Sequence, residues 1–180
     1  IREEWHRWLH QNELTTIFTP NPEQVVLAHG DALFCKQLLE AKVLIPDGAG
    51  LVIAARVLSP EKKSQIARIT GTDLLDWWLG QAEEEATKTF LLGGQKGVAN
   101  RLAHQNDPTS FWCKGMHGYE DVAAPTPEEE RAVLEALKAW SPKVLWVAFG
   151  APHQERWVLE HQEALQKMGV KIVVVCGGAF

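Results

Sequence analysis

The run Val-Leu-Trp-Val-Ala-Phe at residues 144–149 decides the fold class, together with the run Lys-Ile-Val-Val-Val at residues 171–175. Both runs are almost wholly apolar, without the alternation of a strand that has one face in water, and are typical of strands buried on both faces. Between them, residues 153–168 have the periodicity of a helix. A buried strand, a helix and another buried strand predict a parallel sheet covered by helices.

The same alternation of short apolar runs and helical segments extends back to the start of the chain. It predicts an α/β fold: a Rossmann-like, mostly parallel sheet with helices on both faces, in a single domain of 180 residues. The predicted strands are residues 15–19, 43–46, 89–92, 110–114, 144–149 and 171–175. The predicted helices are residues 2–13, 22–40, 49–58, 72–88, 97–105, 127–140 and 153–168.

Three helix starts can be read directly from the residues. Asn21 followed by proline is a typical N-cap with proline in the first turn. Thr126 is also followed by proline, and Glu129 three residues later completes a capping box. Thr70, with Asp73 three residues on, predicts a further start.

Composition excludes several classes of protein. With 46% hydrophobic and 23% charged residues, the chain falls in the range of globular domains and outside that of disordered ones. Its formal charge of −5 argues against nucleic acid as a partner. No apolar run reaches the roughly 20 residues that a membrane-spanning helix needs.

The cysteines and the chain ends also carry information. Cys35, Cys113 and Cys176 are odd in number and widely spaced, which disfavours a disulfide framework and a structural zinc site and fits a reducing cytosol. The chain begins at Ile1 without a methionine and stops at Phe180 directly after a strand-like run. We therefore expect a sequence trimmed at both ends.

Glycine and proline gather where the predicted strands end. Ligands of a parallel α/β sheet bind at that edge, and glycine amides and helix N-termini suit an anionic ligand. We therefore expect a phosphate-rich ligand there. The loops concerned are Thr19-Pro20-Asn21-Pro22, Pro46-Asp47-Gly48-Ala49-Gly50, Gly93-Gly94-Gln95-Lys96-Gly97, Gly150-Ala151-Pro152-His153-Gln154-Glu155 and Gly177-Gly178.

Asp47 is the strongest candidate for a catalytic residue. Its Pro-Asp-Gly context is a common turn sequence, which favours a structural role. It also follows a buried-type strand and precedes the apolar residues 51–55, so its carboxylate is expected at the mouth of the crevice with restricted access to water. There it would act as a general base.

Gly93 and Gly94 open a glycine loop between a strand and a helix, as in dinucleotide-binding proteins. The spacing is not G-x-G-x-x-G, and ordinary turn chemistry explains the loop about as well. The acidic residue that would bind a ribose is also missing, since the next strand leads to Lys114. An NAD(P)-dependent oxidoreductase is therefore kept only as an alternative.

Two further side chains are candidates for ligand contacts. Arg68 would neutralise a diphosphate, or serve as an ordinary surface arginine. Gln154 lies in the first turn of a helix, where its amide would reach a ligand, while His153 and Glu155 fit equally well as solvated first-turn residues. Because no Asp-x-Asp pair occurs and these two residues lack a third ligand, we expect no metal ion and no other cofactor.

Tryptophan is frequent, with eight residues in the chain. Trp5 and Trp8 share a helix face and Trp146 lies in a strand, so these rings are interpreted as core. Trp77 and Trp78 are adjacent and cannot share one face. One of these two rings would then be available to a second subunit or a membrane interface, which makes a homo-oligomer one alternative.

Read together and in order, the blocks after the strands resemble the WecG/TagA/CpsF family of bacterial glycosyltransferases over nearly the whole chain. The resemblance includes residues 68–74, Leu92-Gly93-Gly94, His117-Gly118-Tyr119 and residues 177–180. It implies the fold already predicted. It also implies transfer of a sugar, best known as N-acetylmannosamine or its uronic acid, from a UDP donor to GlcNAc linked to undecaprenyl diphosphate, in the synthesis of wall teichoic acid or another surface polysaccharide.

The resemblance also implies roles for individual residues. Asp47 aligns with a proposed catalytic base, Arg68 with a diphosphate contact and Gln154 with a substrate-binding amide. Thr19 and Asn21 align with residues that line the acceptor and base pocket, although Asn21 is also the predicted helix cap. Further substrate contacts are expected from the glycine loops at Gly93, Gly94, Gly177 and Gly178.

The implied reaction is a single inverting displacement, with Asp47 as general base and no metal. Family members usually continue past the last glycine block with a basic helical segment that docks on the membrane and closes the site, and this chain lacks it. A catalytically silent nucleotide-sugar binding module is therefore a second alternative. The implied location is cytoplasmic, peripheral to the inner face of the bacterial plasma membrane.

Overall fold

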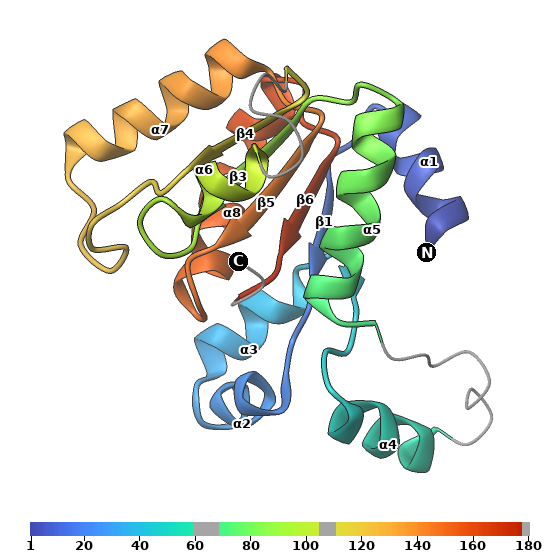
Figure 1. The fold of residues 1–180 in the computed structure, drawn as a ribbon. Helices are drawn as coiled ribbons and strands as arrows, with labels where there is room; N and C mark the ends of the chain where they lie inside the picture. The colour runs from blue at the N-terminus through green and yellow to red at the C-terminus, as the bar shows by residue number, and fades with distance from the viewer. Residues whose placement is uncertain (60–68, 105–110, 178–180) are drawn as a thin grey trace.

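The predicted alternation of strands and helices is present in the computed structural model, which describes residues 1–59, 69–104 and 111–177 (Figure 1). The helices are α1 (Arg2–His10), α2 (Pro22–Gly30), α3 (Ala32–Leu39), α4 (Ala49–Leu58), α5 (Gly71–Glu84), α6 (Val98–Ala103), α7 (Pro127–Trp140) and α8 (His153–Lys167). The strands are β1 (Thr15–Phe18), β2 (Val43–Leu44), β3 (Thr89–Gly93), β4 (Cys113–Met116), β5 (Val144–Ala148) and β6 (Ile172–Val175).

The six strands form one sheet in the order β2-β1-β6-β5-β3-β4, and every neighbouring pair is parallel. The centre is in close register, with Ile172 of β6 opposite both Thr15 and Val144. This confirms the predicted α/β class and the central place of the two most apolar strands. Because all strands run the same way, their carboxyl ends and the loops after them share one edge.

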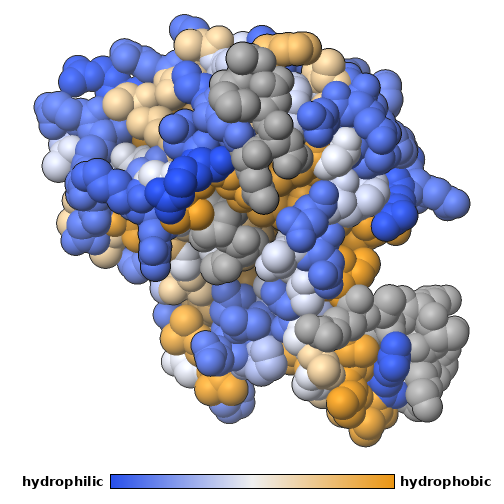
Figure 2. All heavy atoms as spheres, in the orientation of Figure 1, coloured by the Kyte–Doolittle hydropathy of each residue, from blue (hydrophilic) through white to orange (hydrophobic). Residues whose placement is uncertain are grey.

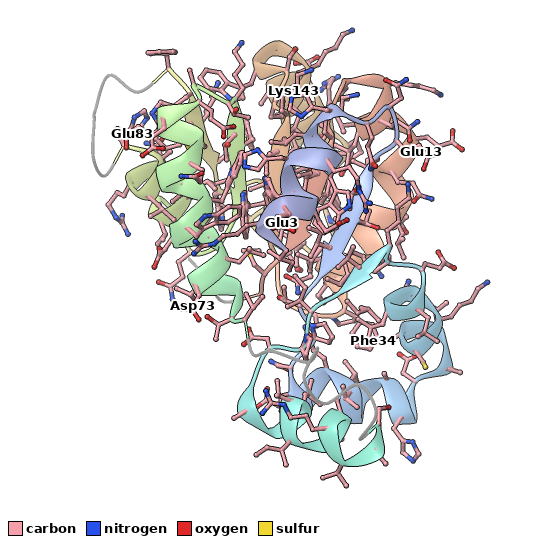
Figure 3. The ribbon with its side chains drawn as sticks, turned by 90° about the vertical axis from the view of Figure 1, so that its right-hand side faces the viewer. Glu3, Glu13, Phe34, Asp73, Glu83 and Lys143 are labelled. Carbon is pink, nitrogen blue, oxygen red and sulfur yellow. The ribbon has the colours of Figure 1, made fainter. Side chains whose placement is uncertain are left out.

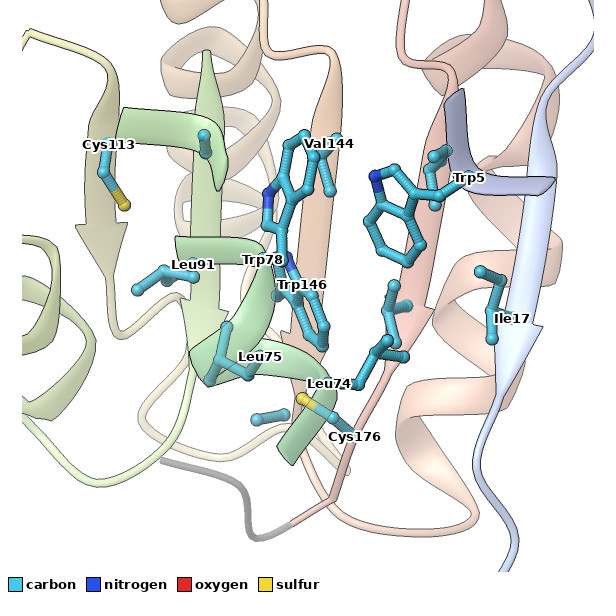
Figure 4. Packing of buried hydrophobic residues seen from close by; sticks show 14 of the residues in the cluster. Trp5, Ile17, Leu74, Leu75, Trp78, Leu91, Cys113, Val144, Trp146 and Cys176 are labelled. Atoms are coloured by element: carbon cyan, nitrogen blue, oxygen red, sulfur yellow. The ribbon is translucent and has the colours of Figure 1, made fainter. Parts of the chain in front are cut away.

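Alternate side chains of the central strands supply two hydrophobic cores, one on each face of the sheet. In β5, Trp146 joins the core under α1, α5 and α6, whereas Val147 joins the core under α3, α7 and α8. The ring of Trp5 lies 5.1 Å from that of Trp78 and 6.1 Å from that of Trp146 (Figure 4). The interpretation of these tryptophans as core is confirmed.

The adjacent pair Trp77 and Trp78 divides between two environments, as predicted. Trp78 is fully buried, and its indole N–H donates to the Thr89 hydroxyl at 3.0 Å. Trp77 is half-buried, with the ring of Trp5 edge-on at 5.5 Å and the guanidinium group of Arg2 at 5.4 Å from its centre. Helix α1 therefore covers part of the ring that was a candidate for a partner surface.

One predicted helix was wrong. Residues 22–40 form two helices, because the chain leaves helical geometry at Asp31. The Asp31 carboxylate accepts the backbone N–H groups of Leu33 and Phe34, at 2.9 and 3.0 Å, and so starts α3. Three boundaries also differ by three residues or more: α1 ends at His10 rather than residue 13, β4 begins at Cys113 rather than residue 110, and α5 ends at Glu84 rather than residue 88.

The other predicted helix starts are confirmed. Asn21 and Gln24 form a reciprocal capping box at α2, as do Thr126 and Glu129 at α7. The Thr70 hydroxyl accepts the backbone N–H of Asp73 at the start of α5. Each of these helices therefore begins at a residue that the sequence marks.

Candidate active site

The loops after the strands meet at the carboxyl edge of the sheet and are joined by hydrogen bonds. After β1 and β2, the backbone N–H of Asp47 donates to the carbonyl of Pro20 at 2.9 Å. After β3 and β5, the N–H of Gly94 donates to the carbonyl of Ala148 at 2.8 Å. Candidate residues that lie far apart in the sequence are thus held at one edge, as the parallel sheet predicted.

Asp47 lies half-buried at this edge, between the end of β2 and the start of α4. Its Oδ2 accepts the backbone N–H of Gly71, the first residue of α5, at 3.4 Å. The N-terminus of a helix attracts a carboxylate through its free N–H groups and its dipole. Asp47 is therefore an acceptor group held at the sheet edge, and its role as a general base stays a prediction.

Cys176, at the end of β6, lies next to Asp47. Burial raises the pKa of the Cys176 thiol, and the negative charge of Asp47 raises it further. The thiol donates to the carbonyl of Val147 at 3.6 Å. The Cys176 thiol therefore stays uncharged beside the carboxylate, and a buried, uncharged thiol is a poor nucleophile.

Thr19 and Gly71 pack together beside Asp47. The buried Thr19 hydroxyl donates to the carbonyl of Val175 at 2.9 Å, which ties the end of β1 to β6. A Cβ at Gly71 would lie 3.3 Å from Cys176 Cβ and 3.5 Å from Thr19 Oγ1, so glycine lets α5 approach the sheet closely. Thr19 thus lies against Gly71, whose backbone N–H donates to Asp47, and the contact of Thr19 with a substrate stays a prediction.

Asn21 serves as the helix cap. Its Oδ1 accepts the backbone N–H of Gln24 at 2.9 Å, and Gln24 Oε1 accepts the N–H of Asn21 at 3.1 Å. The side-chain oxygen of Asn21 is thus occupied by α2. The predicted contact of Asn21 with the acceptor stays a prediction.

Gln154 holds two of the loops together. Its Oε1 accepts the backbone N–H groups of Gly150 and Gly177, each at 3.2 Å, which joins the loop after β5 to the loop after β6. Its Nε2 donates to Oε1 of Glu155 at 3.0 Å. The amide is 1% exposed, so its direct contact with a ligand stays a prediction beside this observed bracing role.

The sequence fitted two interpretations of Glu155 equally well, a solvated first-turn residue and a residue that contacts a ligand. The first interpretation is wrong, because Glu155 is buried. The residue is 1% exposed, and its Oε1 also accepts from Nε2 of Gln24 at 3.4 Å. Its Oε2 is buried and has no hydrogen-bond partner among the described residues, and burial raises the pKa of this carboxyl group. The sequence did hold a signal, because Gln154, Val158 and Leu165 recur at helical spacing and mark the inner face of α8.

Gly93 and Gly94, at the end of β3, lie close to the neighbouring strand β5 at the sheet edge. Gly93 has a φ of 108°, and a Cβ there would lie 2.5 Å from the carbonyl oxygen of Ala148. The carbonyl of Gly94 lies 2.9 Å from Nδ1 of His117, a residue that the sequence offered only as part of a motif. These contacts account for both glycines structurally, and their binding of substrate stays a prediction.

Comparison with known proteins decides the family. The profile described as "Glycosyl transferase WecG/TagA/CpsF family" matches residues 1–180. The chain belongs to the WecG/TagA/CpsF glycosyltransferase family. The family resemblance and the fold that it implied are thereby confirmed.

Curated relatives of this family member include proteins of Staphylococcus aureus. A protein of strain MRSA252 named N-acetylglucosaminyldiphosphoundecaprenol N-acetyl-beta-D-mannosaminyltransferase is 29% identical over 166 residues, which is 91% of this chain and 61% of the relative. The protein of the same name from strain NCTC 8325 / PS 47 is 31% identical over 159 residues, which is 86% of this chain and 59% of the relative. The chain thus spans about three fifths of the length of the curated relatives it matches.

Several predicted features of this WecG/TagA/CpsF family member stay predictions. Arg68 and Gly178 lie outside the described residues. Within residues 1–59, 69–104 and 111–177, no three His, Cys, Asp or Glu side chains are gathered as metal ligands, and independence from metal stays a prediction. No helix in the same ranges has the length and apolar character needed to cross a bilayer.

Proposed function

We propose that this chain is the catalytic core of an inverting glycosyltransferase. It moves N-acetylmannosamine, or a related hexose, from a UDP donor to GlcNAc on undecaprenyl diphosphate. Asp47 carries the proposal: a half-buried carboxylate, held at the N-terminus of α5 on the ligand-binding edge, in a chain whose whole length matches a glycosyltransferase family. The names of the relatives support the acceptor and the transferred sugar.

The proposed step is one displacement. Asp47 takes the proton of the acceptor 4-hydroxyl group as that oxygen forms a bond to C1 of the donor sugar. The bond from C1 to the diphosphate oxygen breaks, and UDP leaves with the electron pair. Backbone N–H groups of the glycine loops and Arg68 would stabilise the leaving diphosphate.

The setting of this reaction is the cytoplasmic face of a bacterial membrane. The acceptor named for the relatives carries a lipid, so the enzyme must work beside a bilayer. The three cysteines are free, which fits a reducing compartment. The family match weighs against the NAD(P)-dependent oxidoreductase.

The test is transfer of sugar from a set of UDP-sugars to GlcNAc-diphosphoundecaprenol. Asp47→Asn removes the base and keeps the side-chain size, and should lower the rate about 10²- to 10⁴-fold. Asp76→Asn, an exposed position on α5, is the matched control and should leave the rate unchanged. Normal turnover by Asp47→Asn contradicts the assignment. No transfer by the unmodified chain, with a thermal shift on adding UDP, would favour the binding-module alternative.

A further inference from the structure

The exposed apolar side chains of this protein are concentrated at one end. Of the eleven large hydrophobic residues that are exposed in the described ranges, nine lie between residues 25 and 58. Those nine belong to α2, α3, β2 and α4. We name the most exposed of them the apolar tip: Val26, Leu33, Leu39, Ile53, Val57 and Leu58.

Helix α4 contributes three of the six residues of the apolar tip. Unlike an ordinary surface helix, it turns most of its large apolar side chains toward solvent. Its sequence, Ala-Gly-Leu-Val-Ile-Ala-Ala-Arg-Val-Leu, has a single charged residue, yet only Val52 is buried. Ile53, Val57 and Leu58 recur at helical spacing and are 61%, 71% and 82% exposed. Between them on the same face lie only Gly50 and Ala54, so the outward face of α4 carries no polar side chain. A helix this apolar is normally covered.

Helices α2 and α3 continue the same pattern. In α2 the polar side chain of Gln24 points inward and is buried, whereas Val26 is 74% exposed. In α3, Leu33 and Leu39 are exposed, and their respective neighbours Phe34 and Leu38 are buried. Figures 1 and 3 both place α2, α3 and α4 at the same end of the molecule, beyond the carboxyl edge of the sheet, and Figure 2 shows hydrophobic residues over this end.

The apolar tip adjoins the candidate active site. Helix α4 starts two residues after Asp47, and a Cβ at Gly48 would lie 3.3 Å from the ring of Pro22, the first residue of α2. The two helices therefore diverge from a common point beside the carboxylate. The starts of α2 and α4 therefore connect the apolar tip to the sheet edge that holds Asp47.

We propose that the apolar tip is the surface by which this chain meets a lipid bilayer, so that the acceptor reaches Asp47 directly from the membrane. This inference rests on the proposed function, in which the acceptor is carried by a lipid. The sugar and diphosphate of such an acceptor lie at the bilayer surface, and the base must come within reach of them. An outward face of α4 that is apolar and uncharged suits insertion into the boundary between head groups and acyl chains.

A bilayer also fits the shape of the apolar tip better than a second protein chain does. A protein partner needs a complementary surface with a polar rim, whereas a fluid bilayer moulds itself to separate projections. The side chains of the tip are presented by three helices. The acidic residues of the helices that form the tip, Glu23, Asp31 and Glu40, belong to α2 and to the ends of α3, and α4 itself has no acidic residue.

The test is sedimentation of the chain with vesicles of phosphatidylethanolamine and phosphatidylglycerol, without donor or acceptor. We expect the unmodified chain to bind, and to stay bound at high salt, because the contact is apolar. The double variant V57S/L58S should bind about tenfold more weakly or worse. Phe111→Ser is the matched control, since Phe111 is as exposed as Val57, at 71%, but lies outside the tip, and it should bind like the unmodified chain.

Three results would overturn the proposal: no binding of the unmodified chain, equal binding by V57S/L58S, or a dimer in sedimentation equilibrium that V57S/L58S dissociates. The last would make the tip a contact between copies. If circular dichroism shows that the double variant is unfolded, Val26→Ser on α2 replaces it, with a smaller loss in the same direction. Because the vesicles hold no substrate, failure of sugar transfer leaves this measurement unaffected.

Discussion

The carboxyl group of Glu155 fixes which way the amide of Gln154 faces. Gln154 Nε2 donates to Glu155 Oε1 at 3.0 Å, and this leaves Oε1 of Gln154 to accept the N–H groups of Gly150 and Gly177. The reverse orientation would set an amide N–H against two other N–H donors. The loops after β5 and β6 are thus held through one buried pair of neighbouring residues.

Replacement of Gln154 by Leu should destabilise the protein. It keeps a side chain of similar size but leaves the N–H groups of Gly150 and Gly177 without their acceptor, at a cost of about 2 kcal/mol in the free energy of unfolding. Urea unfolding measures the change. Gln162→Leu, at an exposed position of the same helix, should stay within about 0.5 kcal/mol of the unmodified chain. Equal stability of the two variants would contradict the bracing role.

The stability of the protein should depend on the charge of Glu155. Burial raises the pKa of Glu155 in the folded state, so the protonated form favours folding. This contribution is complete below the unfolded-state pKa of about 4.3 and is lost as pH rises through the higher folded-state pKa. Glu155→Gln has no charged form, so its unfolding free energy should rise relative to that of the unmodified chain as pH increases.

Urea unfolding over a series of pH values tests this dependence. Glu163→Gln, on the exposed side of α8, is the control and should show no such trend. A difference between Glu155→Gln and the unmodified chain that is the same at every pH would show that Glu155 has an ordinary pKa.

Two glycine substitutions should have opposite effects on stability. Gly93→Ala places a Cβ 2.5 Å from the carbonyl oxygen of Ala148, at a φ of 108°, and should cost about 3 kcal/mol in the free energy of unfolding. Gly80→Ala lies in α5 with open space around its Cβ, and should add about 0.5 to 1 kcal/mol. Thermal and urea unfolding distinguish the two outcomes, and a Gly93→Ala variant as stable as the unmodified chain would contradict the packing described at the sheet edge.

Sugar transfer should continue after removal of metal ions. The proposed stabilisation of the diphosphate comes from backbone N–H groups and Arg68 rather than from a cation. The transfer rate with EDTA present is therefore expected to equal the rate with added Mg²⁺ or Mn²⁺. A metal-dependent glycosyltransferase in the same buffer confirms that the chelator acts, and strict dependence of this chain on either cation would overturn the metal-free mechanism.

Most of the fold could be predicted because its signals are local. The strands around Trp146 and Val174 show as apolar runs, and the starts of α2 and α7 show as capping residues. The break at Asp31 was missed because residues on both sides of it keep helical periodicity, and only the carboxylate contacts with the next turn reveal it.

The site was predictable at Asp47 but not in its surroundings. A carboxylate directly after a strand is visible in the sequence, and the parallel sheet fixes the edge on which it lies. The network that joins Gln24, Gln154 and Glu155 spans 131 residues of chain, and polar residue types alone do not show that they are buried together. Burial of such groups is set by packing between distant helices.

The position of β6 has a consequence for how the chain reaches its folded state. The pair β2-β1 and the trio β5-β3-β4 are joined in the sheet through β6, whose residues Ile172–Val175 follow the other described elements along the chain. During synthesis the two groups of strands each keep an open edge until β6 has left the ribosome. The two groups therefore join only after β6 has been made, and the exposed edges of β1 and β5 are where a chain stalled before β6 would aggregate.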